Sequence, residues 1–435
     1  MELHVGKPRK KRVAFRIFSG NRLTLPLLLN IWERNGLDSQ FEIVLIAAEP
    51  NRLAAAQAAE LRRCAAGVYS FMTPHLPALA REVRALRASR VSGGPMPLLV
   101  AGGPHVRGET DLAASCGFDV LYGGAGEEAF LRLGHSLLGG ELKAGDGPRI
   151  FPGQSELAAA GAGLPQWGDY IPVSKYFKTV PPLEISRGCS WKCRYCQTGG
   201  TRACHRNEES ISVYLDELRR RGLPRVGFIS PSALETGASG ARRPDLERIG
   251  RLLHASRKAG FRLVEFGIFP SEIRPDTVSA DALRLLRRHV ANRRLTFGAQ
   301  SASDARLAAI GRGHSKADVE NAVAMANEAG FAVNLDFIIA LPGETPGERN
   351  ELLDFMAALR RKHRVFFQLH HFFPLAGSAF ASRLPSFLSA AERRKFGALK
   401  KNGLASDWWR EGERTARAFF AWLEQDHPAY LGRFH

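Results

Sequence analysis

Two long blocks of alternating strand and helix patterns most constrain the fold of this 435-residue chain. In each block, short apolar runs typical of buried strands are followed by longer segments with apolar residues at helical spacing. The first block covers about residues 13–140, and the second begins at Pro182. This repeated order predicts an α/β architecture with parallel sheets.

The first block predicts a doubly wound, Rossmann-like domain of about five parallel strands within residues 1–140. We expect the apolar strand at 41–47 to be buried on both faces. Ligands of such sheets bind beyond the carboxyl ends of the strands. The expected strands cover residues 13–18, 41–47, 67–72, 97–101 and 119–122, and the expected helices cover 23–32, 51–63, 76–88 and 127–138.

Gly, Pro and Ala dominate residues 141–180, which we expect to form a linker anchored by Trp167 and Tyr170. Residues 181–380 hold six further strand–helix units and predict a partial (β/α)6 barrel, and residues 381–435 predict a helical tail. The expected strands cover 183–186, 225–230, 263–269, 295–301, 333–340 and 365–373, and the expected helices cover 210–221, 245–259, 279–289, 316–329, 347–361 and 389–423.

The chain is strongly basic, with 61 Lys and Arg against 43 Asp and Glu and a formal net charge of +18. Such an excess favours anionic partners such as nucleic acid, phosphorylated ligands or anionic membranes. Because the arginines are spread along the sequence, a general bias of the composition toward arginine would give the same net charge without any binding surface. We therefore expect no nucleic acid partner, and the charge favours an anionic substrate.

Two features bear on the compartment. The basic run at residues 7–12 is not followed by an apolar segment of a signal peptide, and no apolar stretch is long enough to span a membrane. We therefore expect a cytoplasmic protein. Four of the six cysteines fall within sixteen residues, which indicates metal or redox chemistry more than disulfides.

The central motif is Cys189-x3-Cys193-x2-Cys196, directly after the first expected barrel strand. Barrel enzymes build their sites at this end of the strands. Three thiolates at this spacing can hold three irons of a [4Fe–4S] cluster, which leaves the fourth iron open to another ligand. The alternatives are free thiols or a zinc site, for which Cys204 or His205 would supply a fourth ligand.

With Tyr195 at the aromatic position, this motif resembles the defining Cys-x3-Cys-x-aromatic-Cys motif of the radical SAM superfamily. The resemblance extends over about residues 183–380. It implies that S-adenosylmethionine (SAM) binds the open iron through its amino and carboxylate groups. It also implies that the reduced cluster cleaves SAM to a 5′-deoxyadenosyl radical, with flavodoxin or ferredoxin as the reductant.

The same resemblance places the SAM contacts at the ends of the barrel strands, with the methionine moiety at the second, the ribose at the fourth and the adenine near segment 336–344. Gln300 and Glu344 could equally be turn and helix-start residues. The implied SAM-binding residues are Tyr195, Ser230, Glu265, Gln300, Ser301 and Leu341.

A wider resemblance covers nearly the whole chain. The segments 101–105, 124–128, 298–303, 310–314 and 341–345 look like those of a B12-binding-domain/radical SAM family of class B. Several class B members transfer a methyl group to an unactivated carbon or phosphorus centre. The resemblance implies cobalamin in the N-terminal domain, with contacts at Thr73, Gly102, Gly103, Gly124 and Gly126.

One departure concerns cobalt. Many B12 domains supply a histidine ligand from an Asp-x-His-x-x-Gly motif, which this sequence lacks; His75 and His105 lie in candidate loops of a different context. Either cobalamin binds without a protein histidine, or the domain has lost the cofactor. In the second case, the domain is a docking module, and the enzyme catalyses a cobalamin-independent rearrangement, cyclisation or bond formation.

Two further functions compete with these. A tRNA methylthiotransferase would need three further cysteines in its N-terminal domain, where only Cys64 and Cys116 occur. A non-enzymatic iron–sulfur or zinc scaffold would bind no SAM. Two other features have open roles: segment 311–314 either holds an anion or only turns, and one of His370 and His371 is expected to face the barrel interior.

Overall fold

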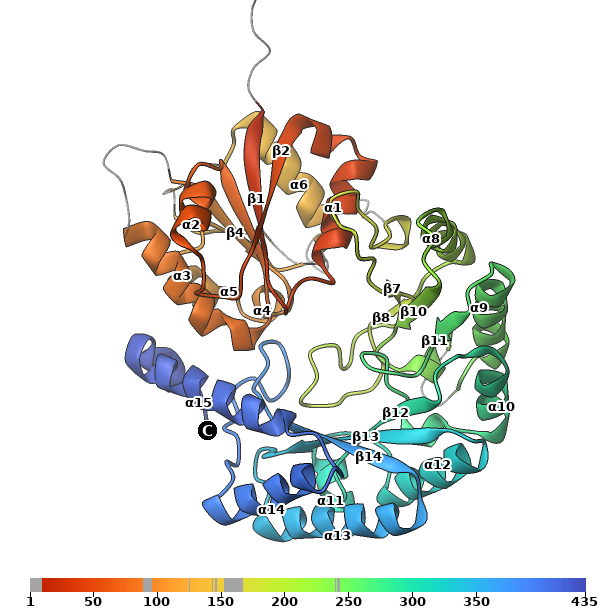
Figure 1. Cartoon of the computed structure of the whole chain (residues 1–435). Helices are drawn as coiled ribbons and strands as arrows, with labels where there is room; N and C mark the ends of the chain where they lie inside the picture. Colours follow the sequence, from red (N-terminus) through yellow and green to blue (C-terminus); the bar gives the residue numbers. More distant parts are fainter. Residues whose placement is uncertain are drawn as a thin grey trace, which may run out of the picture. The chain divides into compact units, whose positions relative to one another are not determined.

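The computed structural model describes residues 10–88, 96–124, 126–142, 144, 147–151, 167–238, 240 and 243–435. The chain divides into two compact units, Met1–Pro181 and Pro182–His435 (Figure 1). The expected fold class is confirmed: a doubly wound α/β domain is followed by a partial barrel and a helical tail. Residues 7–9 of the basic run lie outside the described part. No described helix is both long and apolar enough to cross a membrane.

The first unit contains a parallel sheet in the order β2-β1-β3-β4-β5-β6. Helices lie on both faces of the sheet (Figure 1). The order reverses between β1 and β3, and doubly wound sheets bind ligands at the carboxyl ends beside such a reversal. The elements are β1 (Lys11–Ile17), α1 (Leu25–Arg34), β2 (Phe41–Ala47), α2 (Ala55–Arg62), β3 (Ala66–Ser70), α3 (Leu76–Ala88), β4 (Leu98–Gly102), α4 (Pro104–Gly108), α5 (Thr110–Ser115), β5 (Val120–Tyr122), α6 (Gly126–Gly139) and β6 (Arg149–Phe151).

Trp32 of α1 organises the core between α1, α6 and the sheet. Its ring stacks on those of Phe41 and Phe130, with centroids 4.8 Å from each. Its indole Nε1 donates a hydrogen bond to the carbonyl of Phe130 at 2.8 Å. The side chain is fully buried, so this one residue fixes the helix α6 and the strand β2 against α1.

Two observations differ from the sequence prediction. The strand β2 is not buried on both faces, because it forms the edge of the sheet and leaves Leu45 36% exposed. Residues 149–151, within the segment expected to be a linker, pair with β5 as β6. Beyond them, Tyr170 packs into the core of the first unit, and Asn30 donates a side-chain hydrogen bond to the carbonyl of Val173 at 2.8 Å.

The second unit contains two parallel three-stranded groups, β11-β10-β7 and β12-β13-β14. Backbone bonds of the segment after β11 join them: Thr296 N donates to the Gly267 carbonyl (2.8 Å) and Ile273 N to the Thr296 carbonyl (2.9 Å). The strands therefore form one partial barrel, as the sequence predicts. They are β7 (Leu183–Glu184), β10 (Arg225–Ile229), β11 (Leu263–Glu265), β12 (Arg294–Gln300), β13 (Ala332–Ile339) and β14 (Val365–His371), with the hairpin β8 (Ser186–Arg187) and β9 (Cys204–His205) beside them.

The barrel helices begin directly after residues whose side chains cap them, and these caps explain the positions at which the helices start. Asn207, Asp245, Ser279, Ser315 and Thr345 each accept a hydrogen bond from a backbone N–H of the first turn. The helices cover the outside of the strands (Figure 1). They are α8 (Glu208–Arg220), α9 (Leu246–Lys258), α10 (Ala280–His289), α11 (Asp304–Ala309), α12 (Lys316–Glu328) and α13 (Pro346–Lys362).

The tail forms α14 (Ala390–Lys401), α15 (Trp408–Asp426) and α16 (Pro428–Leu431) rather than one helical run over 389–423. The break between α14 and α15 has a backbone cause. Phe367 N of β14 donates to the Leu404 carbonyl at 3.1 Å, and Ser406 N donates to the Phe367 carbonyl at 2.8 Å. This segment therefore extends the edge of the barrel sheet instead of continuing the helix.

An ion pair is fully buried in the first unit. Arg16 Nε of β1 lies 2.7 Å from Glu82 Oε1 of α3, and their side chains are 0% and 3% exposed. The same guanidinium donates to the carbonyls of Ile46 and Ala48, both at 3.0 Å. Arg16 therefore ties the end of β2 and the residues after it to β1, and Glu82 neutralises its charge.

Replacing Glu82 by Ala is expected to lower the free energy of unfolding by about 3–5 kcal/mol, because it leaves the Arg16 charge buried without its partner. Urea denaturation of the chain followed by circular dichroism measures this change. Arg63→Ala is the matched control, since Arg63 lies in a largely exposed pair with Glu60 and its loss should barely move the transition. An equal effect of the two substitutions would contradict the account.

Candidate active site

The loop that carries the three cysteines is held by its own backbone. The hairpin β8–β9 closes the loop at Arg187 and Cys204. Inside it, Thr201 N donates to the Cys189 carbonyl at 3.0 Å, and Gly200 N donates to the Trp191 carbonyl at 2.6 Å. The three thiols therefore project from one tightly bonded loop at the carboxyl end of the first barrel strand.

Glycine is required where this loop begins. Gly188 has a φ of 81°, and a Cβ there would collide with the carbonyl of Arg202. No side chain fits this close approach of the two ends of the loop. The glycine therefore permits the hairpin that closes the cysteine loop.

The thiols differ in exposure, with Cys193 buried and Cys189 and Cys196 half-buried. Burial raises the pKa of the Cys189 thiol, so its thiolate needs a positive partner or a metal. No three His, Cys, Asp or Glu side chains of the described residues come close enough to share a single metal ion. A [4Fe–4S] cluster does not require the three thiolates to meet at one ion, because each thiolate binds its own iron. The donor set fits such a cluster.

The turn at residues 311–313 packs closely against the cysteine loop. Gly311 and Gly313 have φ of 68° and 78°, and a Cβ at either would lie 2.7 Å from Lys192 or Trp191. Between them, Arg312 Nη1 donates to the Cys193 sulfur at 3.6 Å, and its Nη2 donates to the Gly298 carbonyl at 2.6 Å. The segment is therefore more than a turn, because it brings a buried cation to a cysteine sulfur.

A cavity of about 400 Å³ lies beside Cys189. Ser230 and Ser232, which follow β10, line it together with Glu235. Ser230 Oγ donates to the Ser232 carbonyl at 2.9 Å, whereas the buried hydroxyl of Ser232 has no hydrogen-bond partner. The cavity therefore offers a free hydroxyl next to a cysteine of the motif.

A second cavity of about 260 Å³ opens at the carboxyl ends of β12, β13 and β14, where Tyr195, Glu272, Gln300, Asp336 and His370 line it. Burial, followed by the Asp336 carboxylate, raises the pKa of Glu272 to about 7. His370 Nε2 lies 3.8 Å from Asp336 Oδ2. This cavity combines two carboxyl groups with an aromatic wall next to the cysteine loop.

Buried polar atoms without partners mark both cavities as ligand sites. Ser232 Oγ, Arg312 Nε and Asp336 Oδ1 are buried and have no hydrogen-bond partner in the structure. Buried polar atoms are normally paired, and leaving one unpaired costs free energy. A hydroxyl, a guanidinium and a carboxylate left open in one region match a ligand that carries a carboxylate, an amine and further hydroxyl groups.

The structure brings together some of the predicted SAM residues. Tyr195 and Gln300 line the second cavity, Ser230 lines the first, and Gln300 adopts a φ of 71° that is unusual for a residue with a side chain. Leu341 packs in an apolar cluster with Ile310 and Phe372 that contacts Tyr195. It therefore supports the aromatic residue of the motif from behind.

Glu265 and Ser301 are placed elsewhere. Glu265 pairs with Arg225 at 3.6 Å and lines neither cavity. Ser301 Oγ accepts a hydrogen bond from Ser303 N at 3.2 Å. Glu344 accepts hydrogen bonds from Ala340 N at 2.6 Å and from Arg349 Nε at 3.0 Å, so it holds the bend after β13.

Sequence reasoning missed Glu272, and it named Asp336 and Arg312 only as members of segments 336–344 and 311–314, not as site residues. Glu272 lies seven residues beyond Glu265, after the irregular segment that joins the two groups of strands. Asp336 lies inside a strand, three residues before its end. For Arg312, the only indication in the sequence was the pair of flanking glycines, and two glycines are equally compatible with an anion site and with a simple turn.

In the first unit, the predicted cobalamin residues lie at the carboxyl edge of the sheet. A Cβ on Gly102 would meet nothing within 4 Å, whereas one on Gly103 would lie 2.7 Å from the backbone of Phe71. Gly124 follows β5, and Gly126 is the first residue of α6, with Leu28 at 3.1 Å from its added Cβ. Gly102 therefore leaves room for a ligand, and Gly103 and Gly126 allow close packing.

His105 lies beneath the predicted cobalamin residues Thr73 and Gly103, and its Nε2 is buried without a hydrogen-bond partner in the structure. It is fully buried, its ring stacks on Phe71, and its Nδ1 is hydrogen-bonded to the hydroxyl of the predicted cobalamin residue Thr73 at 3.1 Å. Burial lowers the pKa of His105 to about 4. Thr73 itself is buried.

Residues 183–356 match the family model of the radical SAM superfamily. Heme chaperone HemW of Bacillus subtilis (strain 168) is 27% identical over 188 residues, which are 42% of this chain and 48% of that protein. Ribosomal protein uS12 methylthiotransferase RimO of Desulforudis audaxviator is 29% identical over 191 residues, 42% of this chain and 41% of that protein. The match thus spans about half or less of these curated relatives.

Two solved structures resemble the chain over most of its length. The radical SAM methyltransferase TsrM from Kitasatospora setae, with cobalamin and a [4Fe–4S] cluster bound, has a TM-score of 0.57 at 16% identity, over 86% of this chain and 77% of that one. The cobalamin-dependent SAM radical enzyme OxsB, with aqua-cobalamin bound, has a TM-score of 0.56 at 15% identity, over 80% of this chain and 52% of that one. These likenesses show that the two-unit fold is shared.

Gly188→Ala is expected to destabilise the second unit and to lower iron retention after reconstitution, because its Cβ collides with the backbone that closes the cysteine loop. Gly222→Ala is a matched control with a similar φ of 68° and nothing within 4 Å of its Cβ. Both substitutions cost about 1 kcal/mol for the positive φ, and only the first adds a collision. Thermal unfolding and iron assay of both variants measure the difference. Equal behaviour would contradict the loop geometry.

Proposed function

Because residues 183–356 match the family model of the radical SAM superfamily, we propose that this chain cleaves SAM reductively with a [4Fe–4S] cluster held by Cys189, Cys193 and Cys196. The observation that carries the proposal is the set of open buried polar atoms around the cysteine loop. When bound and reduced, the cluster supplies the electron that cleaves SAM to a 5′-deoxyadenosyl radical. The chain itself binds SAM, orients it and keeps water out.

Residues that line the two cavities, together with Arg312 beside the cysteine loop, match the parts of SAM. The open Nε of Arg312 and the hydroxyl of Ser232 suit the carboxylate of the methionine moiety. The carboxyl groups of Glu272 and Asp336 suit its cationic groups and the ribose hydroxyls. Tyr195, supported by Leu341, provides the apolar wall that a planar adenine needs. A negative pocket next to a buried arginine therefore fits a zwitterionic sulfonium ligand.

We further propose cobalamin-dependent methyl transfer to an unactivated centre. Supporting this, the chain shares its two-unit fold with the cobalamin-bound enzymes TsrM and OxsB. The carboxyl edge of the first sheet also leaves open space over Gly102 beside the close packing at Gly103. This edge includes the reversal of strand order between β1 and β3, where doubly wound domains bind their ligands. A small reductant such as flavodoxin or ferredoxin would supply the electrons.

The cysteine assignment is tested by the triple variant Cys189→Ala, Cys193→Ala, Cys196→Ala. After anaerobic reconstitution it is expected to lose the iron–sulfur absorbance at roughly 420 nm and all SAM cleavage, because no thiolate remains to hold the cluster. Cys204→Ala is the matched control, since Cys204 is exposed and lies outside the motif. The assignment fails if the triple variant keeps the absorbance, or if the control loses it.

The SAM pocket predicts a pH dependence. With the pKa of Glu272 near 7, this carboxyl is mostly neutral at pH 6 and mostly ionised at pH 8. Since the ionised form attracts the cationic ligand, affinity for SAM is expected to rise about tenfold from pH 6 to pH 8. The charged and titratable groups around Glu272 are Asp336, Arg312, His370 and Tyr195.

Calorimetry under anaerobic conditions measures this affinity. Glu272→Gln is expected to bind SAM weakly with a flat pH profile, because it cannot ionise. Glu265→Gln is the control and should keep the native profile, since Glu265 lines neither cavity. A native profile in Glu272→Gln would remove this residue from the SAM site.

A further inference from the structure

The turns that lead into the barrel strands are rich in positive charge. The segments 216–225, 257–262, 284–294 and 360–364 together hold sixteen Arg and Lys and only two acidic residues, in a chain of net charge +18. We call these four segments the basic rim. In the sequence they lie far apart, so the charge looks evenly spread there.

The barrel topology brings the four segments to one edge. All barrel strands are parallel, so every entering turn lies at their amino ends. Arg225 pairs in register with Leu263, and Arg294 pairs with Ala332. Ala291 N donates to the Val264 carbonyl at 2.7 Å, which joins the two groups of strands at this edge. The four segments therefore lie at one edge, where the cation-free turn at residues 329–331, before β13, separates the last segment from the other three.

Most of these cations are exposed and are not neutralised by a carboxylate. Fourteen of the sixteen side chains are exposed. In the last three segments, Arg284 pairs with Asp281. Ten other exposed cations there, from Lys258 to Arg364, have no carboxylate within ion-pair distance among the described residues. Crowded like charges of this kind repel one another unless counterions neutralise them.

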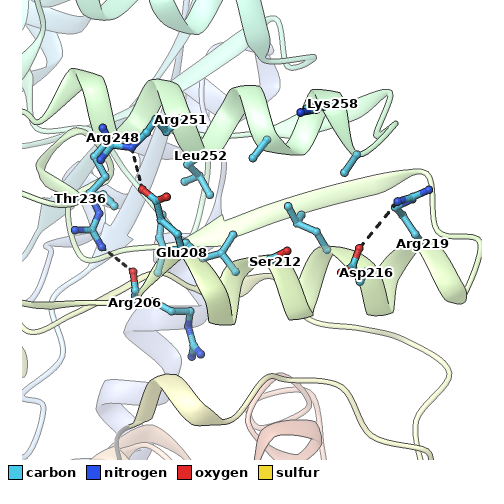
Figure 2. A pocket seen from close by; sticks show the side chains of 15 residues that line it. Arg206, Glu208, Ser212, Asp216, Arg219, Thr236, Arg248, Arg251, Leu252 and Lys258 are labelled. Carbon is cyan, nitrogen blue, oxygen red and sulfur yellow. Dashed lines mark hydrogen bonds and ion pairs between the residues drawn. The ribbon is translucent and has the colours of Figure 1, made fainter.

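One end of the rim can be followed in Figure 2, in a cavity of about 330 Å³ between α8 and α9. Arg219 and Lys258 stand on the two helices near their C-terminal ends, and only Asp216 accompanies Arg219 there, at 4.0 Å. At the other end of the cavity, Arg206, Arg248 and Arg251 surround Glu208, which lies 2.9 Å from Arg251. Positive charge therefore exceeds negative charge along the cavity, and its Arg219–Lys258 end belongs to the rim.

Helix geometry explains only part of this arrangement. Cations at the C-terminal end of a helix interact favourably with its dipole, within its last turn. Arg262, Arg293, Arg294 and Arg364 lie beyond the helix ends, on turns or at strand starts. The helix dipole therefore does not explain these four cations, although Arg294 donates to the Asn334 side chain at 3.0 Å and Arg364 donates to the Asn327 carbonyl at 3.3 Å.

We propose that the basic rim binds the phosphodiester backbone of nucleic acid. Among the described residues, the rim segments contain no exposed large hydrophobic residue, and Leu263 of β11, beside them, is the nearest one in the sequence. Protein interfaces have apolar cores with few charges, and membrane-bound surfaces insert apolar anchors. A polar, arginine-rich surface is typical of nucleic acid interfaces, where guanidinium groups bind phosphates with paired hydrogen bonds.

A protein reductant fits this surface poorly. The cysteine loop lies at the carboxyl ends of the strands, and the basic rim lies at their amino ends. The eight residues of β13 separate these ends by about 26 Å. The rim is therefore remote from the site where electrons are needed, and it acts independently of the proposed chemistry.

The test measures binding of a fluorescein-labelled RNA of about 24 nucleotides, and of duplex DNA of equal length, by fluorescence anisotropy. Affinity is expected to fall steeply between 50 and 200 mM salt. The variant Arg262→Glu, Arg288→Glu, Arg293→Glu should bind about tenfold or more weakly and reduce the salt slope by about 2–3. A second variant, Arg361→Glu, Lys362→Glu, should weaken binding in the same direction.

Arg52→Glu, Arg81→Glu, Arg84→Glu is the matched control, because it reverses three exposed arginines of the first unit. It should bind within about twofold of the native chain. Thermal unfolding verifies that each variant is folded. Equal weakening by control and rim variants, or no salt-dependent binding by the native chain, overturns the proposal. So does tighter, rim-dependent binding to vesicles of phosphatidylcholine and phosphatidylserine, which would make the rim a lipid surface.

Discussion

The close approach of the cysteine loop to the turn at residues 311–313 is the contact on which the rest of the site depends. Gly311 and Gly313 lie so close to Lys192 and Trp191 that a Cβ on either glycine would collide with them. The same contact carries Arg312 to the Cys193 sulfur. It also brings Arg312 near Glu272 and Asp336, so one backbone approach joins the metal-binding loop to the pocket for the ligand.

This arrangement places unlike charges where a zwitterionic ligand needs them. The buried arginine and the two carboxyl groups come from separate strand ends, and a barrel with parallel strands gathers those ends at one edge. The opposite edge collects the turns that follow the helices. Chemistry and the basic rim therefore occupy opposite ends of the same strands, which lets the chain hold an anionic partner without disturbing its cysteine loop.

Much of the fold follows from local sequence patterns, since most predicted strands and helices lie within a few residues of the observed ones. The three cysteines and Tyr195 carry a spacing that points to their chemistry. Glu272 and Asp336 carry no such signal, because their role comes from strand packing between distant segments. The exposure of β2 was mispredicted for a similar reason: an apolar run does not reveal which strand is the edge. The basic rim was also hidden, because topology rather than sequence spacing joins its segments.

The central claim, a cluster-bearing enzyme that also holds cobalamin, is tested most directly by its metal content. The chain is purified anaerobically with iron, sulfide and cobalamin supplied, and iron and cobalt are assayed per chain. The account predicts about four irons and about one cobalt. Less than one iron per chain would contradict it outright. Four irons without cobalt would contradict the cobalamin assignment and leave a cobalamin-independent radical SAM enzyme.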